Sequence, residues 1–182
     1  MENWKKLKED FRIQVLALHR DDWRKYTAMI NKLVQQLSPG APEVTGHDFF
    51  NVVGQEDFTV YIVRHSDQPE NEFIGMATVF QRKLLRGWVA QIHDVVVDDK
   101  YARQGYGRLL TNKIFEYMQV IADREKASIK LSLTSKPDRV RANRMYQSEC
   151  FELIAECPHD PISTLHQKSG TNLYRKIINP SK

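Results

Sequence analysis

The sequence predicts a mixed α/β (α+β) fold, in which helices pack against a sheet of antiparallel and parallel strands. Two long strand-like runs, 73–83 and 88–97, are separated only by Leu84-Leu85-Arg86-Gly87 and indicate an antiparallel hairpin. The second run leads through a glycine-containing loop into an amphipathic helix, and strands then alternate with helices. Strands outnumber helices along the chain, which indicates a mixed sheet.

The elements before the hairpin are a strand, two helices and a second strand. Apolar residues recur at helical spacing after Asp21 and Asp22, and either aspartate can cap that helix. The four expected elements are a strand over 12–18, a helix that ends at Leu37, a helix over 47–55 and a strand over 59–64.

The elements after the hairpin alternate between helix and strand, which is typical of βαβ units. The helix that follows the glycine loop has an apolar face that runs from Leu109 to Ile121. The later elements are a strand over 128–133, a helix over 140–149 and closing strands over 151–155 and 172–178.

The loop between the hairpin and the following helix predicts a site for a phosphorylated ligand. Backbone N–H groups at the start of a helix have no partner within the helix, and the helix dipole favours negative charge there. Gly105 and Gly107 are expected to tolerate positive φ and close approach of the ligand, while Arg103 and Arg108 add charge. The G-x-G-x-x-G fingerprint is incomplete because Leu110 stands at its third glycine, and the Walker pattern is absent.

The composition and net charge of the chain indicate which classes of ligand or macromolecule it binds. At 182 residues we expect a single domain over 1–182. The net charge of +4 is spread along the chain, which disfavours a nucleic-acid binder and favours a small polyanionic cofactor. The charged first ten residues, the lack of a membrane-length apolar run, and the thiols Cys150 and Cys157 predict a cytoplasmic protein without a membrane partner.

A second motif follows the strand over 128–133. It opens a helix on which Arg139, Asn143, Tyr146 and Cys150 are expected to share one face, at offsets of four, seven and eleven. The chain thus contains, in order, a long hairpin, V-x-V, R-Q-G-Y-G, a helix, a strand, A-N-R-M-Y and a Cys-Phe pair.

This order of motifs resembles the GNAT superfamily of acetyl-CoA-dependent N-acetyltransferases, over roughly 11–178. The resemblance implies a splayed central mixed sheet with helices on both faces, an acetyl-CoA co-substrate and an acetyl-CoA-binding core over 92–155. The family commonly has Arg or Gln where Ala102 stands, Gly where Arg103 stands and Gly where Cys150 stands.

The resemblance also implies which residues hold the cofactor. Backbone groups of the strand would contact the pantetheine arm, the loop would bind the pyrophosphate, and an asparagine would contact the arm. The expected cofactor-binding residues are Val95, Val96, Val97, Arg103, Gln104, Gly105, Tyr106, Gly107, Arg108 and Asn143.

Three residues are candidates for catalysis. The resemblance places Tyr146 near the thioester sulfur, where its hydroxyl would protonate the departing thiolate; the alternative is a core aromatic. An alkyl ammonium of pKa ~10 must lose a proton before it attacks, and His93 is the leading candidate base, with a water chain as the alternative. Asp94 would orient His93 only if a bulge breaks the strand alternation, and is otherwise structural.

The expected function is direct transfer of acetyl from acetyl-CoA to a small-molecule amine, in a ternary complex without a covalent enzyme intermediate. The alternatives are acetylation of a protein lysine or N-terminus, and a non-catalytic regulator that binds acyl-CoA. The sequence leaves open whether the protein forms a homodimer. We expect no metal, because His47, His159 and His166 lack zinc-site spacing and are interpreted as solvated loop residues.

Overall fold

The computed structural model describes residues 13–53, 55–67, 72–157 and 171–181. The elements, in chain order, are β1 (Ile13–Ala17), η1 (Arg20–Asp22), α2 (Trp23–Leu37), α3 (Gly46–Val53), β2 (Phe58–His65), β3 (Gly75–Leu84), β4 (Gly87–Val97), η2 (Asp99–Tyr101), α4 (Tyr106–Glu125), β5 (Ile129–Ser135), α5 (Val140–Ser148), β6 (Glu152–Cys157) and β7 (Thr171–Ile178). Each strand and helix predicted from the sequence is confirmed in type.

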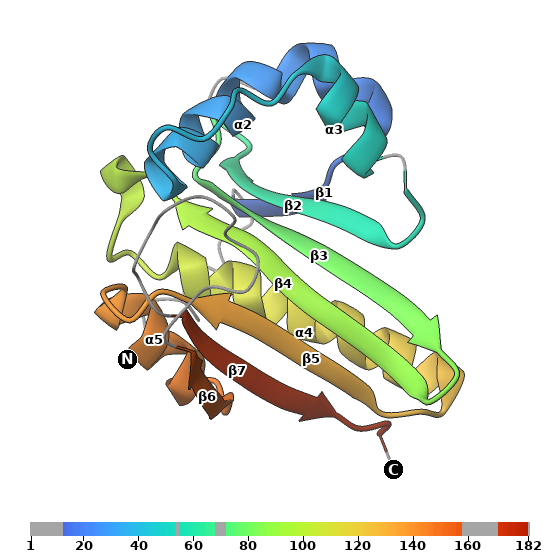
Figure 1. Ribbon diagram of the computed structural model, residues 1–182. Coiled ribbons are helices and arrows are strands. Elements are labelled where there is room, and N and C mark those ends of the chain that lie inside the picture. The colour runs from blue at the N-terminus through green and yellow to red at the C-terminus, as the bar shows by residue number, and fades with distance from the viewer. Residues whose placement is uncertain (1–12, 54, 68–71, 158–170, 182) are drawn as a thin grey trace. The chain divides into compact units, whose positions relative to one another are not determined.

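The strands found in these residues form one seven-stranded sheet in the order β1-β2-β3-β4-β5-β7-β6 (Figure 1). The pairing of β4 with β5 is parallel, whereas β1 with β2, β2 with β3, β5 with β7, and β6 with β7 are antiparallel. A mixed α/β fold is therefore confirmed.

The chain divides into two compact units, one within Met1–Gln81 and His93–Tyr117 and the other within Arg82–Ile92 and Met118–Lys182. Among the described residues, no helix combines the length and the apolar character that crossing a membrane requires.

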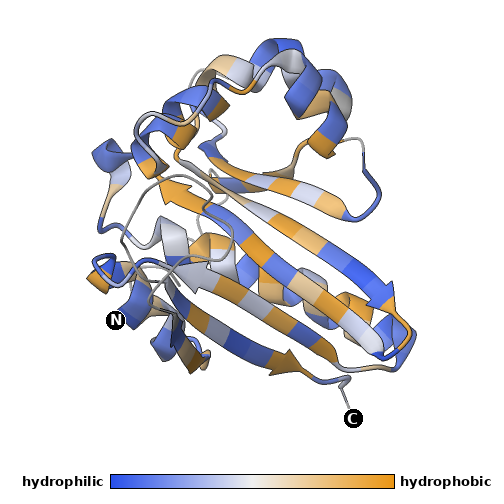
Figure 2. Ribbon diagram, viewed as in Figure 1, coloured by the Kyte–Doolittle hydropathy of each residue, from blue (hydrophilic) through white to orange (hydrophobic). Residues whose placement is uncertain are grey.

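In the first unit, α2 and α3 contribute to an apolar core together with residues of β2. Tyr26, Ile30 and Leu33 recur at helical spacing on α2 and are buried with Phe49 of α3 and Ile62 of β2. Partly buried apolar residues of α2, including Met29, Val34 and Leu37, pack against this core, and most of the remaining positions of the helix are polar (Figure 2). Burial of each large apolar side chain stabilises the fold by about 1.5–3 kcal/mol, so this cluster fixes the helices on the sheet.

The start of α2 differs from the expected cap. Asp22 occupies the N-cap position, but its side chain makes no capping hydrogen bond to the helix. Its φ of −76° and ψ of −5° are helical, whereas a capping side chain normally extends from a β-region residue. Its carboxylate instead accepts a hydrogen bond from the His19 N–H at 2.9 Å, because the short turn η1 precedes the helix.

In the second unit, β5 pairs with β4 and β7. Apolar and polar residues alternate along β5, and Ile129, Leu131 and Leu133 are buried (Figure 2). Tyr174 of β7 lies opposite Leu133 in the ladder and is almost fully buried. The strand β5 ends at Ser135, directly before the turn that begins α5.

The helix α5 does not include all four residues that were predicted to share one helical face. Asn143 and Tyr146 are buried on this helix, as expected. Arg139 is the N-cap residue and Cys150 lies beyond the C-cap Glu149, with φ of 62°, so these two do not continue the helical face. The prediction was wrong for Arg139 and Cys150 because spacing alone does not show where a helix ends.

Candidate active site

The strand β4 is interrupted at Asp94. Its φ of 50° lies in the left-handed region, which a regular strand residue does not adopt. Ile92 and Val96 are buried, whereas Asp94, which strict alternation would place on the same face, is exposed. The strand therefore has a bulge-like break directly after the half-buried His93. Such a break is the condition that the sequence analysis set for Asp94 to orient His93.

The end of β4 approaches the start of β3 unusually closely. A Cβ atom added at Gly75 would lie 2.6 Å from the Val96 carbonyl oxygen, so the strand requires a glycine here. The Asp98 N–H also donates to the Ile74 carbonyl at 2.8 Å. Gly75 was not predicted as part of the site, although a glycine within a strand pattern is a signal for close backbone approach.

The loop between η2 and α4 contains two residues with positive φ. Gly105 has φ of 99°, as expected for a glycine at such a turn, and Arg103 has φ of 66°. Arg103 therefore occupies a conformation that favours glycine, at the position where the resemblance leads one to expect glycine. Gly107 is the second residue of α4 and its φ is not positive, so its expected role is limited to close approach of the ligand.

The first turn of α4 has the features of an anion-binding helix terminus. The Gly105 carbonyl accepts the hydrogen bond of the Leu109 N–H at 3.0 Å, which marks where the helical ladder begins. No acidic side chain lies in this first turn. The exposed Arg103 and the half-buried Arg108 add positive charge to the end of the helix dipole.

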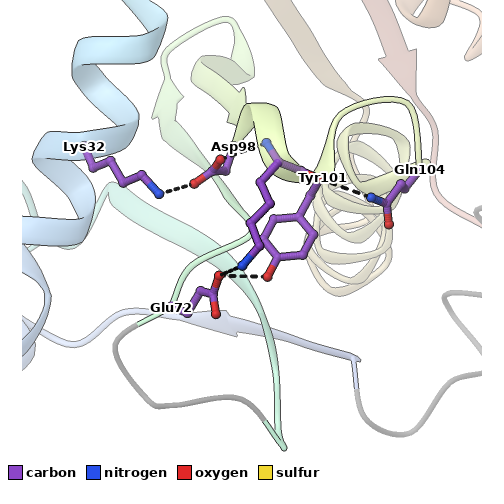
Figure 3. Close-up of polar contacts among 6 residues, drawn as sticks. Lys32, Glu72, Asp98, Tyr101 and Gln104 are labelled. Atoms are coloured by element: carbon purple, nitrogen blue, oxygen red, sulfur yellow. Dashed lines mark hydrogen bonds and ion pairs between the residues drawn. The ribbon is translucent and has the colours of Figure 1, made fainter.

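The remaining predicted cofactor-binding residues of the first unit are Gln104, Val95, Val96 and Val97. Gln104 is exposed, and its amide donates to the Lys100 carbonyl at 3.5 Å (Figure 3). Val96 is buried, whereas Val95 and Val97 are half-buried on the strand end that follows the break at Asp94.

Polar contacts that the sequence analysis did not find hold the segment before α4 (Figure 3). The nearly buried Asp98 pairs with Lys32 at 2.5 Å and accepts the Lys100 N–H at 3.0 Å. Burial raises the pKa of Asp98, but the hydrogen bonds from Lys32 and Lys100 outweigh it, so the pKa is lowered. Lys32 is 66 residues from Asp98, so no local pattern in the sequence indicates this ion pair.

In the second unit, Tyr146 is held among aromatic rings. Its ring centroid lies 6.0 Å from that of Phe151 and 5.9 Å from that of Tyr174. Only 5% of the residue's surface is exposed, and burial raises the pKa of Tyr146 to about 12. The phenol is therefore a proton donor at neutral pH and not a base.

Asn143 lies one helical turn before Tyr146 and is also buried. Its amide nitrogen donates to the Lys136 carbonyl at 2.9 Å and to the Pro137 carbonyl at 3.3 Å. Its amide oxygen is buried and has no hydrogen-bond partner among the described residues, and the same is true of the Ser135 hydroxyl. A buried acceptor without a partner is costly, so Asn143 is well suited to accept a hydrogen bond from a ligand.

The other ionisable residues that the structure describes form no metal-binding cluster. His47 lies 2.9 Å from the Asn51 side-chain amide on the exposed side of α3. Within the described ranges, no group of three or more His, Cys, Asp or Glu residues could hold a metal ion. His159 and His166 lie outside those ranges.

A model of the acetyltransferase (GNAT) family matches residues 15–150, which is most of the chain. The chain belongs to the GNAT family. As a GNAT protein it is an acyltransferase whose co-substrate is acetyl-CoA. No curated protein matches the sequence.

Solved GNAT structures have the same fold at low sequence identity. Arabidopsis thaliana NAA60 with a bisubstrate analogue is 18% identical, with a TM-score of 0.72 over 93% of this chain and 99% of that one. Spermidine N-acetyltransferase from Vibrio cholerae is 14% identical, with a TM-score of 0.68 over 91% and 94%. The ribosomal-protein-S18-alanine N-acetyltransferase from Escherichia coli is 15% identical, with a TM-score of 0.62 over 93% and 96%.

Proposed function

We propose that this GNAT protein transfers the acetyl group of acetyl-CoA directly to an amine of a small molecule. The observation that carries the proposal is the first turn of α4, which has no acidic side chain and follows a broken strand within residues that match the family model. In the reaction the amine nitrogen attacks the thioester carbonyl carbon, an amide bond forms and the C–S bond breaks. The amine loses a proton and CoA leaves as the thiol.

The cofactor assignment follows from charge and unpaired backbone groups. The pyrophosphate would bind at the first turn of α4, with Gln104, Gly105, Tyr106 and Gly107 contributing backbone groups. Arg103 and Arg108 would supply positive charge to the pyrophosphate. Val95, Val96 and Val97 would present backbone groups to the pantetheine arm, and the partnerless amide oxygen supports a contact of Asn143 with that arm.

The catalytic assignment rests on chemistry that each side chain can perform. Tyr146 stays protonated and would donate to the thiolate as the C–S bond breaks. His93 would accept the proton of the amine, and the break at Asp94 supports a role for that carboxylate in orienting His93. A backbone N–H freed at the break, at Val95, would stabilise the oxyanion.

The acceptor is the part of the proposal that the fold does not decide. Solved relatives at similar TM-scores include a spermidine acetyltransferase and a ribosomal-protein alanine acetyltransferase. A small-molecule amine is our first proposal, and a protein N-terminus or lysine is the alternative. We further propose that residues 1–182 act as one N-acetyltransferase domain in the cytoplasm, with 92–155 as the acetyl-CoA-binding core.

A panel of acceptors distinguishes the two proposals. The purified chain is incubated with acetyl-CoA and either polyamines, other small amines, or peptides with free N-termini, and thiol release is recorded. We expect at least one small amine to be acetylated faster than any peptide. Faster release with peptides would favour the alternative, and the same peptides with blocked N-termini would then separate lysine from N-terminal acetylation. No amine-dependent release would contradict the proposal.

A further inference from the structure

The loop before α4 adopts a conformation that must be held by its surroundings. A non-glycine residue in the left-handed region costs free energy and persists only where neighbouring contacts determine the backbone. Arg103, with φ of 66°, is such a residue, and it lies between η2 and the start of α4. The side chains that fix the two ends of this loop therefore control its conformation.

Two tyrosines bracket Arg103, and their rings touch. Tyr101 ends η2 and Tyr106 begins α4, and their ring centroids lie 6.0 Å apart in an edge-to-face arrangement. We call this pair the tyrosine clamp. Tyr106 is buried, whereas Tyr101 is half-buried.

Each hydroxyl of the tyrosine clamp is bound by a residue outside the loop. The Tyr106 hydroxyl lies 3.0 Å from Nε2 of His65, at the end of β2. The Tyr101 hydroxyl donates to Glu72 at 2.9 Å, and Lys100 pairs with the same carboxylate oxygen at 2.5 Å (Figure 3). Both ends of the strained loop are therefore connected to the β2–β3 region.

We propose that the tyrosine clamp holds the loop in its cofactor-binding conformation, with His65 and Glu72 as positioning residues. This inference rests on the proposed function, because it assumes that acetyl-CoA binds at the loop. His65 acts through the Tyr106 hydroxyl and Glu72 through the Tyr101 hydroxyl, so neither needs to touch the cofactor. Loss of either hydrogen bond lets the loop relax and weakens binding without removing a cofactor contact.

The test compares Tyr101→Phe and Tyr106→Phe with Tyr117→Phe in the full-length chain. Tyr117 is a matched control, because it lies about three turns along α4 and its hydroxyl accepts a hydrogen bond from Gln81 at 2.9 Å. Acetyl-CoA affinity is measured by calorimetry at a temperature where circular dichroism shows every variant folded. We expect each clamp variant to raise the Kd about three- to ten-fold, and Tyr117→Phe to leave it unchanged.

A second set of variants separates positioning from stability. We expect His65→Leu to raise the Kd as much as Tyr106→Phe, the double variant to add nothing further, and His65→Gln to restore binding because its amide reaches the place of Nε2. Clamp variants that lower the melting temperature but keep the wild-type Kd, or an equal rise of the Kd in Tyr117→Phe, would overturn the inference. If wild type itself fails to bind acetyl-CoA, the proposed function fails, and the inference fails with it.

Discussion

Tyr146 shows how burial changes the role that a residue can have in catalysis. A phenol of pKa about 12 is a weaker acid than a free tyrosine, and the thiol of the leaving group has a pKa of only ~8.5. Full proton transfer from Tyr146 to the thiolate is therefore unfavourable. A hydrogen bond that strengthens as the thiolate forms remains favourable, because the donor is always protonated at neutral pH.

The variant Tyr146→Phe tests this role. We expect kcat to fall by roughly 10²-fold, the lower part of the range for general acids, because the hydroxyl acts only as charge develops on sulfur. The Kd for acetyl-CoA should stay within about two-fold of wild type. Stopped-flow thiol release and calorimetry provide the two measurements. An unchanged kcat across the pH range would mean that the Tyr146 hydroxyl does not stabilise the departing thiolate.

His93 is tested through the pH dependence of the rate. If it is the base, kcat/KM should decline at acidic pH as the imidazole is protonated, and His93→Gln should lose this acidic limb. Glutamine keeps polarity and most of the volume, so packing is preserved. A wild-type rate with the same acidic limb in His93→Gln would reject His93 and leave a water chain as the alternative.

At the residue scale, residues that stand in a short local motif could be predicted from the sequence. Residues that contact each other only in the folded chain could not. Gly105, Asn143 and Tyr146 stand in short patterns whose spacing predicts where they lie. Asp98 pairs with Lys32, which is 66 residues away, so no local pattern contains both.

At the scale of elements, helix and strand types were predictable because apolar periodicity differs between them. The break in β4 was not, since Asp94 has no sequence signal for positive φ. The same holds at the end of α5, where Cys150 occupies the left-handed position that glycine normally fills.

The end of α5 provides a stability prediction. The Phe151 N–H donates to the Tyr146 carbonyl at 3.1 Å, which closes a helix-ending turn around Cys150 with φ of 62°. Cys150→Gly should stabilise the fold by about 0.5–1 kcal/mol, because glycine adopts this conformation without strain. Thermal unfolding should show a rise in Tm of roughly 2 °C. Cys150→Ala, which removes the thiol but keeps the Cβ atom, should show no rise.

At the scale of the whole molecule, the spread of the +4 net charge suits a small anionic cofactor better than an extended polyanion. The family, the fold class and the acyltransferase chemistry were predictable, because they depend on motifs that lie close together in the sequence. The acceptor was not, because neither 38–48 nor 157–171 carries a motif that indicates one.

Calorimetric titration of acetyl-CoA and NAD into wild type and Gly107→Val tests whether the first turn of α4 binds the cofactor. Gly107 lies in the first turn of α4, where a branched side chain would obstruct the approach of a phosphate to the backbone. We expect acetyl-CoA to bind wild type at one site per chain, NAD to bind far more weakly, and Gly107→Val to lose most of the affinity for acetyl-CoA. Full acetyl-CoA affinity in Gly107→Val, or equal affinity of wild type for NAD, would contradict this expectation.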